Sequence, residues 1–233
     1  MSELLNPYFQ VGLDVMEQPC LVIGGGREAE DKAGRLLAAG ARLTVVSPSA
    51  TPALVEWAEA GRLTYHPRCF AESDLEGVFL VLNTVRDRAL TARVYELATA
   101  RKALINSYDN PAYSNIGMVA LVHPGHLRLS ISTSNASPAL SSHLRQDFEE
   151  IFDGEFAAYL DCLAEARQRV RAKVADRETR FALLRSLVSG FRLEGTLRYP
   201  ADWKRHVDAL LTCELELCGT EERCVDCPLG SNK

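Results

Sequence analysis

The feature that most constrains the fold is segment 19–47, PCLVIGGGREAEDKAGRLLAAGARLTVVS, in which a glycine triplet follows a short apolar run. The run 20–23 is apolar at every position, as in a strand buried on both faces of a parallel sheet. Gly24, Gly25 and Gly26 follow, and Ala29 completes a G-x-G-x-x-A spacing. Glycines at this spacing allow a tight turn and let backbone N–H groups approach phosphate at a helix N-terminus. The segment therefore predicts a strand–helix–strand unit that binds a dinucleotide.

The end of the second strand, at Ser47 and Pro48, lacks the acid that usually binds the ribose hydroxyls about 20 residues after the glycines. Arg27 and Arg42 leave NADP open, and NAD is the favoured cofactor. The predicted cofactor-binding residues are the glycine turn and the ends of two apolar strands, namely Gly24, Gly25, Gly26, Arg27, Glu28, Ser47, Pro48, Asn83 and Thr84.

Alternating apolar runs and helical stripes continue to about residue 112 and predict a parallel sheet with crossover helices. The expected strands are 63–66, 78–82 and 103–106, and the expected helices are 51–61 and 90–100. The fold class is therefore α/β, a Rossmann-like NAD-binding domain over 1–112, followed by a smaller α+β portion and a helical C-terminal region.

The pattern changes after residue 112. Two strands are expected at 118–122 and 127–133, joined by a His-Pro-Gly-His turn that favours antiparallel or edge pairing. An apolar helical stripe then runs from 140 to 160 and is broken only weakly at Gly154. Further helical pattern covers 163–188, with a final helix over 202–217. The expected divisions are a dimerisation and substrate segment 113–150, a helical domain 151–210 and a cysteine-rich tail 211–233.

Composition excludes several classes of protein. A net charge of −5 argues against a general nucleic-acid binder. No apolar run approaches the length of a membrane span, and the N-terminus has no secretory pattern, so a cytoplasmic protein is expected. An odd number of cysteines, 7, favours thiols or metal ligands over a disulfide framework.

Four cysteines lie close together near the C-terminus in the spacing C-x4-C-x5-C-x2-C, namely Cys213, Cys218, Cys224 and Cys227. Thiolates so spaced can surround zinc or an iron–sulfur cluster, and the sequence does not choose between the two. A reduced tail and a redox-sensing disulfide pair are the alternatives. The isolated Cys20, Cys69 and Cys162 are expected to be small buried apolar residues.

Several motifs in order resemble the bifunctional siroheme-synthesis enzymes, the precorrin-2 dehydrogenase/sirohydrochlorin ferrochelatase family. They span about residues 6–150 and comprise Pro7-Tyr8-Phe9, Gly24–Gly26, Lys32, Gly40-Ala41, Ser47-Pro48, Asn83-Thr84, Asn106–Asp109 and Ile131–Pro138. The chain departs from the family pattern at three places. Ser134-Asn135 replaces Gly-Gly, Gly117-Met118 replaces an aromatic-Pro pair, and Glu28-Ala29 replaces Val-Ala.

The resemblance implies NAD-dependent oxidation of precorrin-2 to sirohydrochlorin, in some members followed by Fe²⁺ insertion to give siroheme. It places the functional aspartate at Asp109, which is expected to act as the base; by pattern alone, Asp109-Asn110-Pro111 is also a good turn. It further implies a homodimer joined through the segment after the Rossmann-like unit.

The substrate that the resemblance implies is a flexible tetrapyrrole with many carboxylates. Its expected binding residues are hydroxyls and cations of the 113–150 segment, namely Ser132, Thr133, Ser134, Ser137, Arg128 and Arg145. Simple N-capping by Ser137 ahead of Pro138 is the alternative for the hydroxyls, and solvated surface charge is the alternative for the arginines.

Two other functions remain open from the sequence. A nucleotide-, metal- or redox-sensing regulatory protein would keep the Rossmann-like unit and use the cysteine tail. An ordinary NAD dehydrogenase for small alcohols or acids would need a Tyr-Lys or His arrangement, and no convincing one is present in the sequence.

Overall fold

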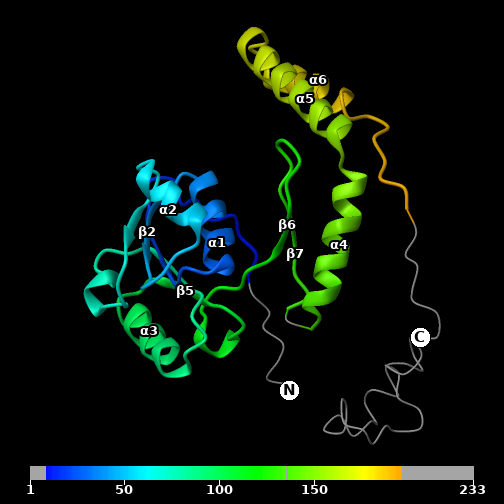
Figure 1. Ribbon diagram of the computed structural model, residues 1–233. Coiled ribbons are helices and arrows are strands. Elements are labelled where there is room, and N and C mark those ends of the chain that lie inside the picture. The colour runs from blue at the N-terminus through cyan, green and yellow to red at the C-terminus, as the bar shows by residue number, and fades with distance from the viewer. Residues whose placement is uncertain (1–8, 135, 196–233) are drawn as a thin grey trace, which may run out of the picture. The chain divides into compact units, whose positions relative to one another are not determined.

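The computed structural model describes residues 9–134 and 136–195 (Figure 1). The chain divides into two compact units, the first ending at Glu165 and the second beginning at Ala166. The expected helix 202–217 and the cysteine-rich tail lie outside the described residues, as do Pro7, Tyr8 and Asn135.

A five-stranded parallel sheet forms the main part of the first unit and has the order β3-β2-β1-β4-β5. Its strands are β1 (Pro19–Ile23), β2 (Arg42–Val46), β3 (Thr64–His66), β4 (Leu80–Asn83) and β5 (Leu104–Ser107). The connecting helices are α1 (Arg27–Ala38), α2 (Pro52–Glu59) and α3 (Arg88–Ala100). The strand order reverses direction at β1 and β4, and ligands bind at such a switch point in open α/β sheets. The predicted Rossmann-like fold is confirmed.

The sheet is buried on both faces, which explains why its strands are continuous apolar runs. On one face, Val22 and Val45 pack in a cluster with Ala33 of α1 and Leu54 of α2. On the other face, a second cluster joins strand residues to α3 and includes Leu21, Ile23, Val81, Ile105, Val94 and Ala98. These two apolar layers fix where each strand ends, and so fix the edge that carries the nucleotide turn.

The outer edge of β5 is covered by the segment that follows it. The side chain of Asn115 imitates a neighbouring strand, because its Oδ1 accepts from the N–H of Ile105 at 2.7 Å and its Nδ2 donates to the carbonyl of Ala103 at 3.1 Å. The N–H of Ser107 donates to Ser114 Oγ at 2.9 Å. Backbone groups of an edge strand are thereby satisfied by side chains.

A short hairpin follows, made of β6 (Ala120–Val122) and β7 (Leu129–Ile131), which pair antiparallel as predicted but over fewer residues. It packs against α4 (Pro138–Ile151). Ser137 is the N-cap of α4, since its Oγ accepts from the N–H of Leu140 at 3.2 Å, and Pro138 occupies the first turn.

The long helical stripe is interrupted twice, and here the sequence interpretation was wrong in its detail. A definite break at Phe152 and Asp153 separates α4 from α5 (Gly154–Lys173), and α6 (Arg177–Ser186) is separate again. Asp153 Oδ1 accepts from the N–H groups of Glu155 and Phe156 at 3.0 Å, and Asp176 caps α6 in the same way. A capping carboxylate starts a new helix at each point, although the apolar spacing continues across the first break.

Candidate functional site

The glycine turn lies at the carboxyl edge of the sheet, between β1 and α1. Gly24 has φ of +111°, a conformation that favours glycine, and its N–H donates to the carbonyl of Val46 at 3.0 Å. A Cβ at Gly25 would lie 1.9 Å from the carbonyl oxygen of Ser49. The turn is therefore packed directly against the loop that follows β2, and this contact requires glycine.

The N-terminus of α1 has no side-chain cap. Gly26 is its N-cap residue, with φ of −84° and ψ of −172°, and a Cβ there would have no atom within 4 Å. The first N–H groups of a helix have no intrahelical partner and attract anions. Arg27 and Glu28 follow at the exposed start of the helix. The cradle thus fits the pyrophosphate of a dinucleotide, as the sequence predicts.

The ends of β2 and β4 flank this turn, as expected for Ser47, Pro48, Asn83 and Thr84. Ser47 is buried at 7% exposure, and its carbonyl accepts from the hydroxyl of Tyr65 at 3.0 Å. Thr84 Oγ1 donates to the carbonyl of Ile23 at 2.9 Å.

Asn83 is fully buried at the end of β4. Its Nδ2 donates to Thr91 Oγ1 at 3.1 Å, and its Oδ1 accepts from the N–H of Val85 at 3.2 Å. Both ends of its carboxamide are used inside the fold. Asn83 therefore supports the turn, and Thr84, half-buried, is the better placed of the two for contact with a ligand.

Asp109 lies just past the end of β5, exposed, with φ of +53°. A non-glycine residue in this left-handed region is strained, and such strain concentrates at functional sites. Its loop is held on both sides, because the N–H of Tyr108 donates to the carbonyl of Asn83 at 2.8 Å and Ser114 Oγ donates to the carbonyl of Asn110 at 3.0 Å. The backbone of Asp109 is thus held at the same sheet edge as the glycine turn.

Three residues at this edge were not singled out as site residues by the sequence. The ring of Tyr108 has Lys32 Nζ 5.7 Å from its centroid and the guanidinium carbon of Arg86 at 5.5 Å. Lys32 comes from α1, Arg86 follows β4, and Tyr108 follows β5. In the sequence, Lys32 was noted only as part of the family motif. No periodic pattern relates Lys32, Arg86 and Tyr108, so the sequence could not predict that they meet.

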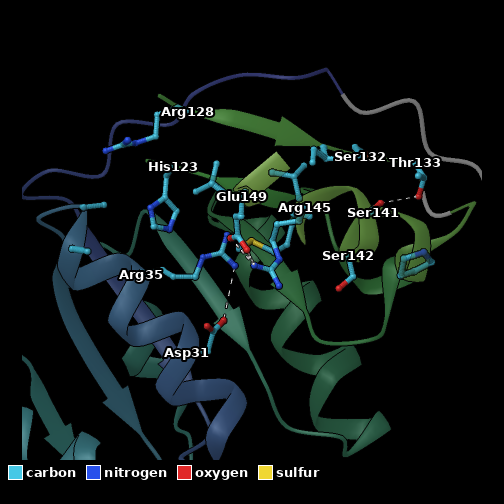
Figure 2. Close-up of a pocket in the computed structure, with 18 residues that line it drawn as sticks. Asp31, Arg35, His123, Arg128, Ser132, Thr133, Ser141, Ser142, Arg145 and Glu149 are labelled. Atoms are coloured by element: carbon cyan, nitrogen blue, oxygen red, sulfur yellow. Dashed lines mark hydrogen bonds and ion pairs between the residues drawn. The ribbon is translucent and has the colours of Figure 1, made fainter. Parts of the chain in front are cut away.

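A separate cavity of about 850 Å³ lies in the first unit between α1 and the α4 segment (Figure 2). Ser132, Thr133, Arg128 and Arg145 line it, together with Asp31 and Arg35 of α1. Neither Asp109 nor the glycine turn is among its lining residues. Four of the six predicted substrate residues are thus brought together, but away from the predicted base.

The polar groups of this cavity are largely paired with one another. Arg145 Nη1 lies 2.5 Å from Glu149 Oε2, Arg35 Nη1 lies 3.9 Å from Asp31 Oδ2, and Arg128 donates to the carbonyls of Gly125 and Leu127. Thr133 Oγ1 is 3.2 Å from Ser141 Oγ. These cations and hydroxyls are compensated within the chain.

The other two hydroxyl residues, Ser134 and Ser137, do not line this cavity. The N–H of Ser134 donates to Ser132 Oγ at 3.1 Å, and Ser134 has φ of +50°. Ser137 caps α4, which is the capping role weighed against substrate binding. The loop is thus organised by bonds among its own hydroxyls and N–H groups.

The expectation that the isolated cysteines are buried holds for only one of them. Cys20 is buried in the sheet, and burial raises the pKa of its thiol to about 11. Cys69 and Cys162 are exposed, so that prediction was wrong. Cys69 lies in the loop after β3, and α5, which carries Cys162, has no buried residue. The four tail cysteines lie outside the described residues.

Within residues 9–134 and 136–195, no group of three or more His, Cys, Asp or Glu is placed to hold a metal ion. None of the helices that the structure describes combines the length and apolar character that a membrane crossing requires.

Fold and turn together define a Rossmann-type NAD(P)-binding protein, and residues 11–120 match the NAD(P)-binding family NAD_binding_7. Over 216 residues the chain is 31% identical to a siroheme synthase of Xylella fastidiosa (strain M12), covering 92% of this chain and 44% of the relative. A siroheme synthase of Methylococcus capsulatus is 32% identical over 173 residues, covering 74% and 36%. The solved structure of SirC, precorrin-2 dehydrogenase, superposes with a TM-score of 0.71 at 28% identity, covering 78% of this chain and 89% of that one.

The chain is thus similar to siroheme synthases and to a solved precorrin-2 dehydrogenase. It spans less than half the length of the siroheme synthases it matches.

Proposed function

We propose that the protein oxidises precorrin-2 to sirohydrochlorin with NAD⁺ as hydride acceptor. The observation that carries this proposal is the joint placement of an uncapped α1 N-terminus behind a glycine turn and of the strained Asp109 at the same sheet edge. The likeness to the solved precorrin-2 dehydrogenase, which extends over 89% of that chain, supports the same activity.

In this mechanism the oxidation removes a hydride and a proton from the tetrapyrrole. When bound, NAD⁺ supplies the hydride acceptor, held at its pyrophosphate by the N–H groups of the glycine turn and the first turn of α1. The Asp109 carboxylate accepts the proton, which requires it to be ionised and exposed to the substrate. Its loop is bonded to β4 and to Ser114, which fixes the backbone that carries this carboxylate.

The residues near the end of β2 support the proposal of NAD over NADP, although Arg27 at the start of α1 stays exposed. Arg42 lies at the opposite end of that strand, where its Nε donates to the carbonyl of Glu17 at 2.9 Å. Arg42 is therefore removed as a ligand for a 2′-phosphate. Ser47 and Pro48, which end the strand, bring no cation.

The homodimer proposal gains support from the separation between Asp109 and the hydroxyl-lined cavity. Within one chain the two do not share a pocket, so a substrate that contacts both needs a second copy or a rearrangement. Met118, Leu140 and Ile151 are exposed apolar residues on or near the same segment, and burying them would favour association.

Fe²⁺ insertion is proposed as a second activity, with iron as a substrate, and Zn²⁺ or an iron–sulfur cluster as the ligand of the cysteine tail. The cytoplasmic location stays a prediction.

The decisive test is anaerobic incubation of the purified protein with precorrin-2 and NAD⁺, followed by the absorption spectrum of sirohydrochlorin. We expect product to form with NAD⁺ and more slowly with NADP⁺. Fe²⁺ is added only in a second stage, and siroheme formation above the protein-free rate would support chelation. Absence of oxidation with either nucleotide would refute the enzyme proposal and favour the sensing protein with its cysteine tail.

A further inference from the structure

Tyr108 lies next to Asp109 and joins three elements of the sheet edge. Its backbone N–H is bonded to Asn83 at the end of β4, and its ring is approached by Lys32 of α1 and by Arg86. Both cations lie within the distance of about 6 Å at which the face of an aromatic ring attracts a positive charge. The ring thus holds two cations beside the proposed base.

The two cations differ in how they are compensated. Lys32 is buried at 7% exposure, and its Nζ lies 3.6 Å from Glu28 Oε2. A buried lysine needs such a partner, so Lys32 belongs to the fold and helps to hold the Tyr108 ring. Arg86 is exposed, and among the described residues it makes no hydrogen bond or ion pair.

A guanidinium held over an aromatic ring keeps its N–H edge available for a planar anion. Asp87, its neighbour in the chain, accepts from the N–H of Leu90 as the cap of α3, and no ion pair within the described residues joins Arg86 to Asp109. By contrast, Arg93 and Arg68 are each bonded to a carboxylate. Arg86 is therefore a positioned cation whose anion is absent from the described chain.

We propose that Arg86 binds a carboxylate of the tetrapyrrole substrate beside Asp109, with the Tyr108 ring and Lys32 holding its guanidinium in place. This inference rests on the proposed function, which supplies a polycarboxylate as the ligand. A cofactor phosphate is the other anion that this guanidinium could bind. The glycine turn follows β1 and Arg86 follows β4, and these two strands are neighbours, with Ile23 in register with Asn83. Substrate is favoured because Arg86 lies past β4, beside Tyr108 and Asp109, whereas the phosphate cradle is at α1.

The experiment compares Arg86→Gln and Arg86→Lys with the unaltered protein in precorrin-2 oxidation. We expect Arg86→Gln to raise the KM for precorrin-2 about tenfold or more, since a charge-assisted pair is lost, with kcat changed less than about twofold. Arg86→Lys should recover part of this loss because it keeps the charge and loses the fork. The Kd for NADH, measured by fluorescence titration, should not change.

Matched controls separate charge from position. Arg88→Gln removes the same charge two positions further on, at an exposed residue that is not one of the cations over Tyr108, and should leave KM unchanged. Tyr108→Leu removes the ring that holds the guanidinium and should raise KM as Arg86→Gln does. The Kd for sirohydrochlorin, measured by absorbance at equilibrium, should rank these variants in the same order as their KM values and does not depend on turnover.

The outcomes are distinguishable. If the unaltered protein does not oxidise precorrin-2, the proposed function fails and this inference fails with it. If it does, and Arg86→Gln has the KM of the unaltered protein or of Arg88→Gln, only the inference is overturned. A weakened Kd for NADH with an unchanged affinity for sirohydrochlorin would also overturn it, by assigning Arg86 to the cofactor phosphate.

Discussion

Gly25 and Gly26 are adjacent in the nucleotide turn, yet the fold itself requires glycine only at Gly25. In Gly25→Ala the new Cβ would lie 1.9 Å from the carbonyl oxygen of Ser49 and 2.9 Å from Cα of Ala50. Both obstacles are backbone, so no side-chain rotation relieves the clash. The two loops must separate by about 1 Å to reach the 3.0 Å below which real Cβ contacts do not occur.

The cost of Gly25→Ala can be bounded. Overpacking of this kind costs about 1–3 kcal/mol, and the separation also weakens the bond from the N–H of Thr51 to the carbonyl of Gly25, 2.9 Å long, worth about 1 kcal/mol. A loss of about 2–4 kcal/mol lowers Tm by about 5–15 °C in a protein of this size. Thermal unfolding followed by circular dichroism measures it.

Gly26→Ala is the matched control, because its Cβ meets nothing within 4 Å and its φ of −84° suits alanine. We expect stability within about 1 kcal/mol of the unaltered protein. Its methyl group would instead obstruct the approach of a pyrophosphate to the backbone, so NADH should bind about tenfold more weakly. An unchanged Tm for Gly25→Ala, or equal losses of stability in the two variants, would refute this reasoning.

Three further predictions concern single side chains. Asp109→Gly should abolish precorrin-2 oxidation and leave the Kd for NADH unchanged. It should also raise Tm, because glycine tolerates the φ of +53° at this position. If the variant still oxidises precorrin-2, Asp109 is not the base. The hydrogen bond from Arg68 holds the pKa of Asp74 below its usual range. At any pH above the ordinary pKa of an aspartate, the ionised pair therefore stabilises the fold. This stabilisation is lost as the pH falls through the lowered pKa of Asp74 in the folded protein. Asp74→Asn should therefore lower Tm at pH 7, by an amount that shrinks in acid; a constant difference would contradict the linkage. Iodoacetamide added to the folded protein should label the exposed Cys69 and spare the buried Cys20, whose thiol pKa is about 11. Peptide mapping by mass spectrometry would identify the labelled cysteine. Early labelling of Cys20 would mean that the sheet opens.

The parallel sheet could be predicted because burial on both faces leaves a strong local mark. Leu21, Val22 and Ile23 form an apolar run without alternation, and the glycines directly after it indicate which end of the strand carries the site. The break at Phe152-Asp153 was underestimated because the apolar spacing continues across it. The rings of Phe148 and Phe152 stack with centroids 6.0 Å apart, and Phe156 follows at 4.7 Å from Phe152. The capping carboxylate of Asp153 was the available signal.

The candidate site divides in the same way. The glycine turn is a local motif, and the family resemblance pointed to Asp109; the structure has both at the carboxyl edge of the sheet, and their roles stay predictions. The contact of Lys32 and Arg86 with one ring joins residues of three elements, and it depends on the register of β1, β4 and β5, which no local pattern encodes. The separation of Asp109 from the hydroxyl-lined cavity likewise depends on how the chain is folded after β5.

The Asn115 carboxamide has a consequence for the topology of the whole chain. By filling donor and acceptor positions along β5, it prevents a sixth strand from joining the sheet at that edge. The next two strands must therefore pair with each other, as β6 and β7 do. Together with Ser114 and the backbone of residues 115 and 116, this side chain closes the edge of the nucleotide-binding sheet, and the following segment forms a separate hairpin. Asn115→Ala would leave the N–H of Ile105 and the carbonyl of Ala103 without these partners, so the outcome to watch for is self-association of the chain at that edge.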